Sequence, residues 1–96
     1  MIDNFSKKTD EEITIWAAKQ AYLTMGNLLT VCAVEEIDAC PIEGFQPDQY
    51  DSYLNLSAKG LQSVLVMAVG HRSVDDAFSE LKKVRRGVDE IVIDLE

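Results

Sequence analysis

The stretch DEEITIWAAKQAYLTMGNLLTVCAVEE, residues 10–36, decides the fold of this chain. Thr9 precedes the stretch and Glu12 follows three positions later, which is the capping box typical of a helix N-terminus. Acidic residues fill the first turn, where the positive end of the helix dipole stabilises them. No proline interrupts the run, and Gly26 is its weakest position, at about 1 kcal/mol against alanine. The sequence therefore predicts one long helix over the whole stretch.

This predicted helix is apolar on almost every side. One set of apolar positions is Ile13, Trp16, Ala17, Ala21, Leu28 and Cys32, and the other is Ile15, Ala18, Tyr22, Met25, Leu29 and Ala33. Such a helix is buried in protein or lies in a membrane. Lys19, Gln20 and Asn27 interrupt the run, which argues against a membrane span. The rest of so short a chain can hardly cover the helix, so we predict a homodimer. A monomer whose remainder wraps the helix is the alternative.

The composition is that of a single acidic globular domain spanning residues 1–96. The hydrophobic fraction of 47% is ordinary for a folded domain, and the formal net charge is -8. Nucleic acids and anionic lipids attract clustered cations, so neither is a predicted partner. Cys32 and Cys40 lack the spacing of metal ligands and His71 does not complete a site, so no metal is predicted. The opening residues have no apolar signal-peptide core, which predicts a cytoplasmic protein.

Short elements of both kinds follow the long helix, which predicts an α+β fold. Pro47 suits the first position of a short helix over residues 47–55, where its missing N–H is harmless. The predicted inner face of this helix consists of Tyr50, Tyr53 and Leu54. A turn is predicted over residues 57–60.

The last third of the chain predicts two strands and a helix. LQSVLVMAV, residues 61–69, is a continuous apolar run between glycines, which predicts a strand buried on both faces. Ser73 begins a second capping pattern, so a helix is predicted over residues 74–82. Gly87 ends that pattern, and EIVIDL, residues 90–95, predicts a terminal strand that needs a neighbour, for which a partner subunit's sheet is one place.

Two groups of residues can carry chemistry. CPIEGF, residues 40–45, is predicted to form a turn after the long helix. The glycine of Glu43–Gly44 lets a planar ligand approach the backbone there, and the carboxylate could orient a substrate. Lys83 and Arg85 lie two residues apart, so in an extended segment they face the same side and could bind a phosphate. On these residues alone, a plain turn and a solvated run of charges are open alternatives, and the function is not identified.

The combination of motifs resembles a known family. WAAKQAYLTMGNLL, CPIEGF, LVMAVGHRSVDD and LKKVRR occur in an order similar to that in the C-terminal half of the nitroreductase family, the FMN-dependent NAD(P)H oxidoreductases. The likeness runs from Trp16 to the C-terminus and is nearest to the oxygen-insensitive nitroreductase and dihydropteridine reductase branch. It implies a fragment of the nitroreductase fold, with a long central dimer helix, a small sheet, and a last strand that crosses to the other subunit.

The resemblance also implies a flavin site. The residues that would contact FMN are Pro41, Ile42, Glu43, Gly44, Lys83, Val84 and Arg85. The N–H of Gly44 would donate toward the flavin N5, and Glu43 would be the catalytic residue at the reactive edge. Lys83 and Arg85 would contact the FMN phosphate. The implied mechanism is ping-pong, in which NAD(P)H reduces the flavin and a nitroaromatic or quinone-like small molecule then takes the electrons.

The chain departs from the family pattern in two places. The N-terminal half of family members supplies further flavin contacts, and nothing in residues 1–15 matches them. Lys82 stands where a proline is common. We therefore expect a complete FMN site to require a missing N-terminal half. Two functions remain. One is an FMN-dependent oxidoreductase, truncated and active only if a missing half is supplied or if the short form binds flavin in an altered way. The other is a non-catalytic dimeric remnant or binding module with the same fold.

Overall fold

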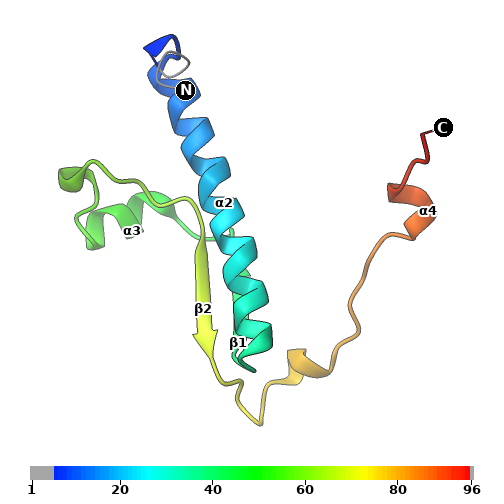
Figure 1. The fold of residues 1–96 in the computed structure, drawn as a ribbon. Coiled ribbons are helices and arrows are strands. Elements are labelled where there is room, and N and C mark those ends of the chain that lie inside the picture. Colours follow the sequence, from blue (N-terminus) through cyan, green and yellow to red (C-terminus); the bar gives the residue numbers. More distant parts are fainter. Residues whose placement is uncertain (1–5, 96) are drawn as a thin grey trace.

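The long helix α2, Asp10–Val34, is the largest element of the computed structural model, which describes residues 6–95 (Figure 1). The backbone N–H of Glu12 donates to Thr9 Oγ1 at 3.1 Å, and Thr9 Oγ1 donates in turn to Glu12 Oε1 at 3.2 Å. Thr9 therefore caps the helix as predicted, although Glu12 accepts from the Thr9 hydroxyl and not from the Thr9 backbone N–H of a full capping box. The helix ends two residues before the predicted end. No helix within the described residues is both long and apolar enough to cross a membrane.

A tight turn centred on Glu36 ends α2 and reverses the chain. The N–H of Ile37 donates to the carbonyl of Cys32 at 2.8 Å, and the N–H of Glu36 donates to the carbonyl of Ala33 at 3.3 Å. This is the hydrogen-bond pattern of a Schellman motif. Glu36 has φ 59°, a left-handed conformation that is usually given to glycine. The turn directs β1, Asp38–Ile42, back alongside α2 (Figure 1).

β1 pairs with β2, Val66–Gly70, in a two-stranded antiparallel sheet. The register runs from Asp38 opposite Gly70 to Ile42 opposite Val66. Cys40, Pro41 and Ile42 were expected in a turn, and this prediction is wrong because they form the second half of β1. The turn proper is confined to Glu43 and the residues after it.

The predicted strand over residues 61–69, buried on both faces, is also wrong in part. The ladder begins only at Val66, and Ala68 and Val69 are exposed. The reason is that β1 offers five residues for pairing, and the described part of the chain supplies no third strand. A continuous apolar run is typical of a central strand, but here the run has a neighbour on one side only.

α3, Pro47–Tyr53, starts at the predicted proline. The backbone N–H of Ser63 donates to Asp51 Oδ1 at 2.9 Å, and Ser63 Oγ donates to the carbonyl of Pro47 at 3.3 Å, which holds α3 against the segment before β2. The predicted inner face of this helix is wrong, since the exposed fractions are 43% for Tyr50, 89% for Tyr53 and 49% for Leu54. No described element is packed closely enough over α3 to bury them.

A short 3₁₀ helix, η1, Ser57–Lys59, confirms the predicted turn over residues 57–60. Gly60 closes it with φ 68°. Here the glycine is required, because this left-handed conformation is strained for other residues.

The predicted helix over residues 74–82 is replaced by a single 3₁₀ turn, η2, Ala77–Glu80. Ser73 Oγ accepts from the N–H of Asp75 at 3.1 Å, and Asp76 Oδ1 accepts from the N–H of Phe78 at 3.0 Å. Each polar side chain thus caps its own local turn, in competition with a continuous helix. The sequence thus predicted the capping role of Ser73 correctly, but the helix expected over residues 74–82 does not form.

The C-terminal segment contains α4, Val88–Ile91, where the predicted terminal strand over residues 90–95 should begin. Gly87 precedes α4 as its N-cap. The residues after Ile91 are extended, as Val92 shows with φ -108° and ψ 129°, but they join no described sheet. The strand prediction is wrong for the single chain, because an extended segment becomes a strand only when a neighbour accepts its hydrogen bonds.

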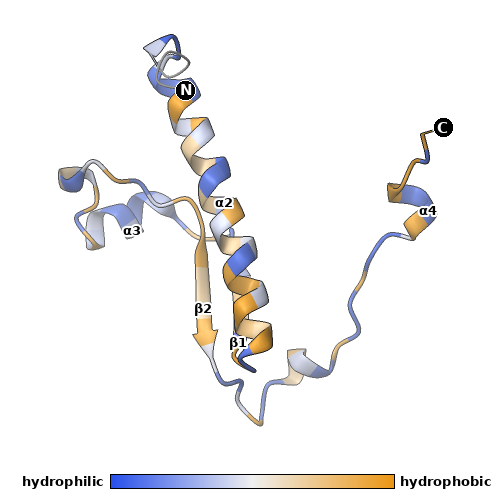
Figure 2. Ribbon diagram, in the orientation of Figure 1, coloured by the Kyte–Doolittle hydropathy of each residue, from blue (hydrophilic) through white to orange (hydrophobic). Residues whose placement is uncertain are grey.

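The apolar surface of α2 is covered on one side only. The covered positions from Ala18 onward recur every three or four residues, and besides Ile13 they are Ala18, Ala21, Met25, Leu29 and the buried Cys32. Away from that face, Leu23 is 67% and Val34 75% exposed, and Figure 2 shows that apolar residues recur along the length of α2. Among the described residues only Cys32 is buried, with 8% of its surface exposed. The radius of gyration is 18.0 Å, against about 13 Å for a compact chain of this length.

An ion pair between Asp38 and Arg72 closes the end of the sheet. The Arg72 backbone N–H donates to Asp38 Oδ2 at 2.8 Å, and Arg72 Nε donates to Oδ1 at 3.0 Å. Arg72 Nη2 also donates to Oδ1. The hydrogen bonds from the Arg72 side chain and backbone lower the pKa of Asp38 to about 2. The pair links residues that are far apart in the sequence and ties the start of β1 to the end of β2.

Replacing Glu36 by glycine should stabilise the chain, because glycine adopts φ 59° without the Cβ clash that other residues meet. We expect the free energy of unfolding to rise by about 0.5–1 kcal/mol in denaturant titrations followed by circular dichroism. The matched control is Glu35→Gly, which removes the same charge at an ordinary φ of -86° and should lower stability. If both substitutions changed the free energy of unfolding equally, the left-handed conformation of Glu36 would be contradicted.

Acid should weaken the sheet through Asp38. Its folded-state pKa lies below the unfolded value of about 3.9, so its contribution is complete above that pH and is lost as the pH falls toward 2. The melting temperature of the wild-type chain should therefore fall more steeply between pH 4 and pH 2 than that of Asp38→Asn. Asp94→Asn, at an exposed position near the C-terminus, should keep the wild-type slope. Parallel slopes for the wild-type chain and Asp38→Asn would show that the ion pair does not form in solution.

Candidate functional site

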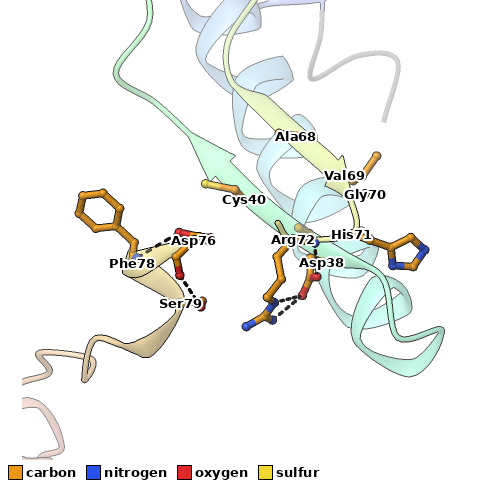
Figure 3. Close-up of a pocket in the computed structure, with 11 residues that line it drawn as sticks. Asp38, Cys40, Ala68, Val69, Gly70, His71, Arg72, Asp76, Phe78 and Ser79 are labelled. Carbon is orange, nitrogen blue, oxygen red and sulfur yellow. Dashed lines mark hydrogen bonds and ion pairs between the residues drawn. The ribbon is translucent and has the colours of Figure 1, made fainter. Parts of the chain in front are cut away.

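A shallow hollow of about 420 Å³ lies where the end of the sheet meets η2 (Figure 3). The Asp38–Arg72 ion pair lies within it, so its strongest charges neutralise each other. Figure 3 shows Cys40 and His71 on opposite sides of that pair, which excludes a thiol–imidazole couple. The Asp76 carboxylate already accepts a hydrogen bond from its own turn. The hollow is lined by none of the predicted flavin residues, and its hydrogen bonds hold the end of the sheet and the η2 turn.

The predicted flavin corner lies at the other end of β1. Pro41 and Ile42 are held in the ladder opposite Met67 and Val66, while Glu43 and Gly44 follow in the connection to α3. The corner therefore begins on a hydrogen-bonded strand and ends in an exposed loop. A strand fixes backbone position better than a free loop, so Pro41 and Ile42 give the corner a defined direction.

A hydrogen bond from α2 reaches this corner. The hydroxyl of Tyr22 donates to Glu43 Oε2 at 2.6 Å, the length expected for a hydrogen bond to a charged acceptor. This bond, with desolvation and the Glu43 charge as lesser causes, raises the pKa of Tyr22 above its ordinary value. The contact was missed by sequence reasoning, because 21 residues separate the partners and nothing in either local motif points to the other.

Gly44 is open to approach from outside the chain. A Cβ built at this position would meet no atom within 4 Å, and its φ is not in the left-handed region. Its N–H donates to no acceptor within the described residues. Neither the backbone conformation nor the surrounding packing explains why glycine stands here. An exposed backbone donor without a bulky side chain fits the edge of a planar ring that accepts a hydrogen bond.

The predicted phosphate-binding residues Lys83, Val84 and Arg85 lie in an extended segment between η2 and α4. All three are exposed, and Arg85 Nη1 donates to the Val84 carbonyl at 2.9 Å. Neither cation forms an ion pair with any residue that the structure describes. Their charges are thus available for an anion, which fits the predicted contact with a phosphate.

The single chain does not bring the two halves of the predicted site together. In Figure 1 the segment that holds Lys83 and Arg85 leads away from α2 and the sheet, whereas Gly44 lies between β1 and α3. The Gly44 N–H suits contact with a flavin ring, and Lys83 and Arg85 suit contact with its phosphate, but the two groups lie apart in the single chain. Their union in one FMN site stays a prediction.

Comparisons with known proteins agree with the sequence resemblance. The sequence model of the Nitroreductase family matches residues 1–71, which include the Glu43–Gly44 corner and exclude Lys83 and Arg85. An oxygen-insensitive NAD(P)H nitroreductase from Salmonella typhimurium is 46% identical over 70 residues, 73% of this chain and 32% of that protein. One from Enterobacter cloacae is 43% identical over 77 residues, 80% of this chain and 36% of that protein.

A putative NAD(P)H nitroreductase from Haemophilus influenzae is 38% identical over 91 residues, 88% of this chain and 39% of that protein. The chain thus spans between 32% and 39% of the length of these curated relatives. The match of the family model to most of the chain, together with these relatives, shows that the chain belongs to the nitroreductase family.

Proposed function

We propose that this chain forms part of an FMN-dependent oxidoreductase that passes electrons from NAD(P)H to nitroaromatic or quinone-like small molecules. The observation that carries the proposal is the corner itself: an exposed, unpaired Gly44 N–H next to the held carboxylate of Glu43, inside the region that the family model matches. The names of the relatives support NAD(P)H as the electron donor.

Each residue of the proposed site has a defined task. FMN, when bound, supplies the electron-transfer chemistry, and the protein orients it. Pro41 and Ile42 hold the backbone edge against which the ring lies, because they are fixed by the ladder with β2. The Gly44 N–H donates to the ring, and Glu43 places a negative charge at its edge. Lys83 and Arg85, with Val84 between them, neutralise the phosphate.

We also propose that the chain is one domain of a cytoplasmic homodimer in which a second copy covers α2. The exposed apolar side of α2 and the large radius of gyration support this, since the chain by itself leaves its main apolar surface in water. Gly26 supports it as well. A Cβ there would meet no atom of this chain within 4 Å, and alanine would make the helix more stable. A glycine in that position allows close approach by a neighbouring helix.

A non-catalytic dimeric module of the same fold is the second candidate. The observation in its favour is that Lys83 and Arg85 lie on a segment directed away from the Gly44 corner in the single chain (Figure 1). The two candidates differ in flavin binding, so one titration separates them. The first candidate requires that the Gly44 corner and the Lys83–Arg85 pair of this chain bind FMN by themselves, whereas the second requires no flavin.

Removing the two cations should weaken FMN binding. Charge-assisted hydrogen bonds contribute roughly 1.5–3 kcal/mol each, so Lys83→Ala with Arg85→Ala should raise the FMN dissociation constant by about a hundredfold or more. Quenching of flavin fluorescence measures it. The matched control is Lys82→Ala with Arg86→Ala, which removes the same charge from the other side of the extended segment and should have a much smaller effect. Equal losses would indicate non-specific attraction, and a wild-type chain that binds no FMN would favour the non-catalytic module.

A charge on the open face of α2 should break the dimer. Leu23 is 67% exposed in the single chain, so Leu23→Glu is tolerated by the monomer but would bury an unpaired charge, at several kcal/mol, in the interface. Light scattering at micromolar concentration should give a dimer for the wild-type chain and a monomer for the variant. Val74→Glu introduces the same charge at a fully exposed loop position and should stay dimeric. A monomeric wild-type chain would contradict the proposed assembly.

A further inference from the structure

The hydrogen bond from Tyr22 to Glu43 joins the most rigid element of the chain to an exposed loop. Tyr22 lies within α2, whose 25 residues are held by a regular ladder of backbone hydrogen bonds. Glu43 lies in the connection after β1, and its carboxylate has no other hydrogen-bond partner in the described structure. The tyrosine hydroxyl is therefore the one group that restricts where this carboxylate lies.

The contact matters because an unrestrained glutamate at the surface samples several rotamers. A charge that moves between positions is screened by water, whereas a charge held in one position acts on its neighbours from a constant distance. At 2.6 Å the hydrogen bond is in the range of charge-assisted O–H···O⁻ bonds, which are about twice as strong as neutral ones. Such a bond is strong enough to select one orientation.

We propose that Tyr22 is a positioning residue whose hydroxyl fixes the Glu43 carboxylate at the Gly44 corner, and that it thereby sets the negative charge that a bound flavin ring meets. The inference rests on the proposed function, since it concerns the same corner. In this proposal α2 supplies a side chain to the site in addition to carrying most of the apolar surface of the chain.

A fixed carboxylate beside the ring has a predictable effect. Electron uptake adds negative charge to the flavin, so a nearby carboxylate disfavours the reduced form and lowers the midpoint potential. Freeing the carboxylate lets it turn into water, where its charge is screened and the potential rises. Tyr22→Phe should therefore change the potential only as long as residue 43 carries a charge.

The contact itself can be tested without flavin. The ultraviolet absorbance change of the wild-type chain minus that of Tyr22→Phe isolates the titration of Tyr22 from that of Tyr50 and Tyr53. Glu43 raises the pKa of Tyr22 through their hydrogen bond, so Glu43→Gln should lower the titration midpoint of Tyr22. Glu43→Asp keeps the charge but shortens the side chain by one methylene, which takes it out of reach, and should lower the midpoint as well.

The effect on the flavin is measured by the midpoint potential of the FMN-loaded chain. Glu43→Gln should raise it by an amount equivalent to about a tenfold change in the preference for reduced over oxidised FMN, or about 30 mV for a two-electron couple. Tyr22→Phe and Glu43→Asp should each give a smaller rise. Tyr22→Phe should add nothing when combined with Glu43→Gln. The control Tyr53→Phe removes the same hydroxyl from an 89% exposed ring and should leave the potential unchanged.

The outcomes separate this inference from the proposed function. A rise in potential for both Tyr22→Phe and Glu43→Asp, absent from the combination with Glu43→Gln, supports the positioning role. FMN binding with a wild-type potential in Tyr22→Phe and Glu43→Asp overturns the positioning role and leaves the proposed function intact. An unchanged Tyr22 titration in Glu43→Gln overturns it too, because the hydrogen bond would then be absent in solution. A wild-type chain that binds no FMN overturns both.

Discussion

α2 carries apolar side chains around its whole circumference, and the rest of the chain can cover one face of it. The sheet that lies against the helix has two strands of five residues each, which is too small to enclose a helix of 25 residues. Leu23 and Val34 therefore lie in water, and the chain remains far more open than its length requires. The open surface of α2 stays uncovered because α3, η2 and α4 do not pack on it, and α3 is held instead to the segment before β2 through Ser63.

The candidate site depends on the same helix. The turn at Glu36 sends β1 back along α2, and this places the end of β1 within reach of Tyr22. The ladder with β2 fixes Pro41 and Ile42, and the hydrogen bond from the helix holds Glu43. A backbone donor at Gly44 is left open between these restraints. The corner is thus shaped by two neighbours that are themselves fixed by backbone hydrogen bonds, although its own residues are exposed.

Features that depend on a few consecutive residues could be predicted from the sequence. Thr9 at the start of α2 and Pro47 at the start of α3 are examples. Thr9 accepts a hydrogen bond from a backbone N–H of the first turn, and Pro47 lacks the N–H that would have no partner there. The strands over residues 61–69 and 90–95 could not be placed in this way, since the extent of a strand is set by the neighbour with which it pairs. The helix expected after Ser73 failed for a local reason, because its polar side chains cap shorter turns instead.

The contacts that shape the site were invisible in the sequence for a different reason. Asp38 and Arg72 are 34 residues apart, and Tyr22 and Glu43 are 21 residues apart, so no periodicity or motif connects them. The reversal at Glu36 brings Glu43 to Tyr22, and the antiparallel pairing of β1 with β2 brings Arg72 to Asp38. The Glu43–Gly44 and Lys83–Arg85 pairs were singled out from the sequence by their chemistry, but chemistry alone does not give their spatial relation.

The extended segment between η2 and α4 has one more consequence. It exposes Lys82, Lys83, Arg85 and Arg86 on backbone that belongs to no helix or ladder. Trypsin cleaves after lysine and arginine where a stretch of chain can unfold locally into its active site, and this segment already meets that requirement. Nicking there would release the C-terminal tail while α2 and the sheet stay whole. If dimer formation or a bound anion orders these four residues, the peptide bonds after them become resistant to trypsin. The time needed for digestion therefore reports whether the segment is ordered.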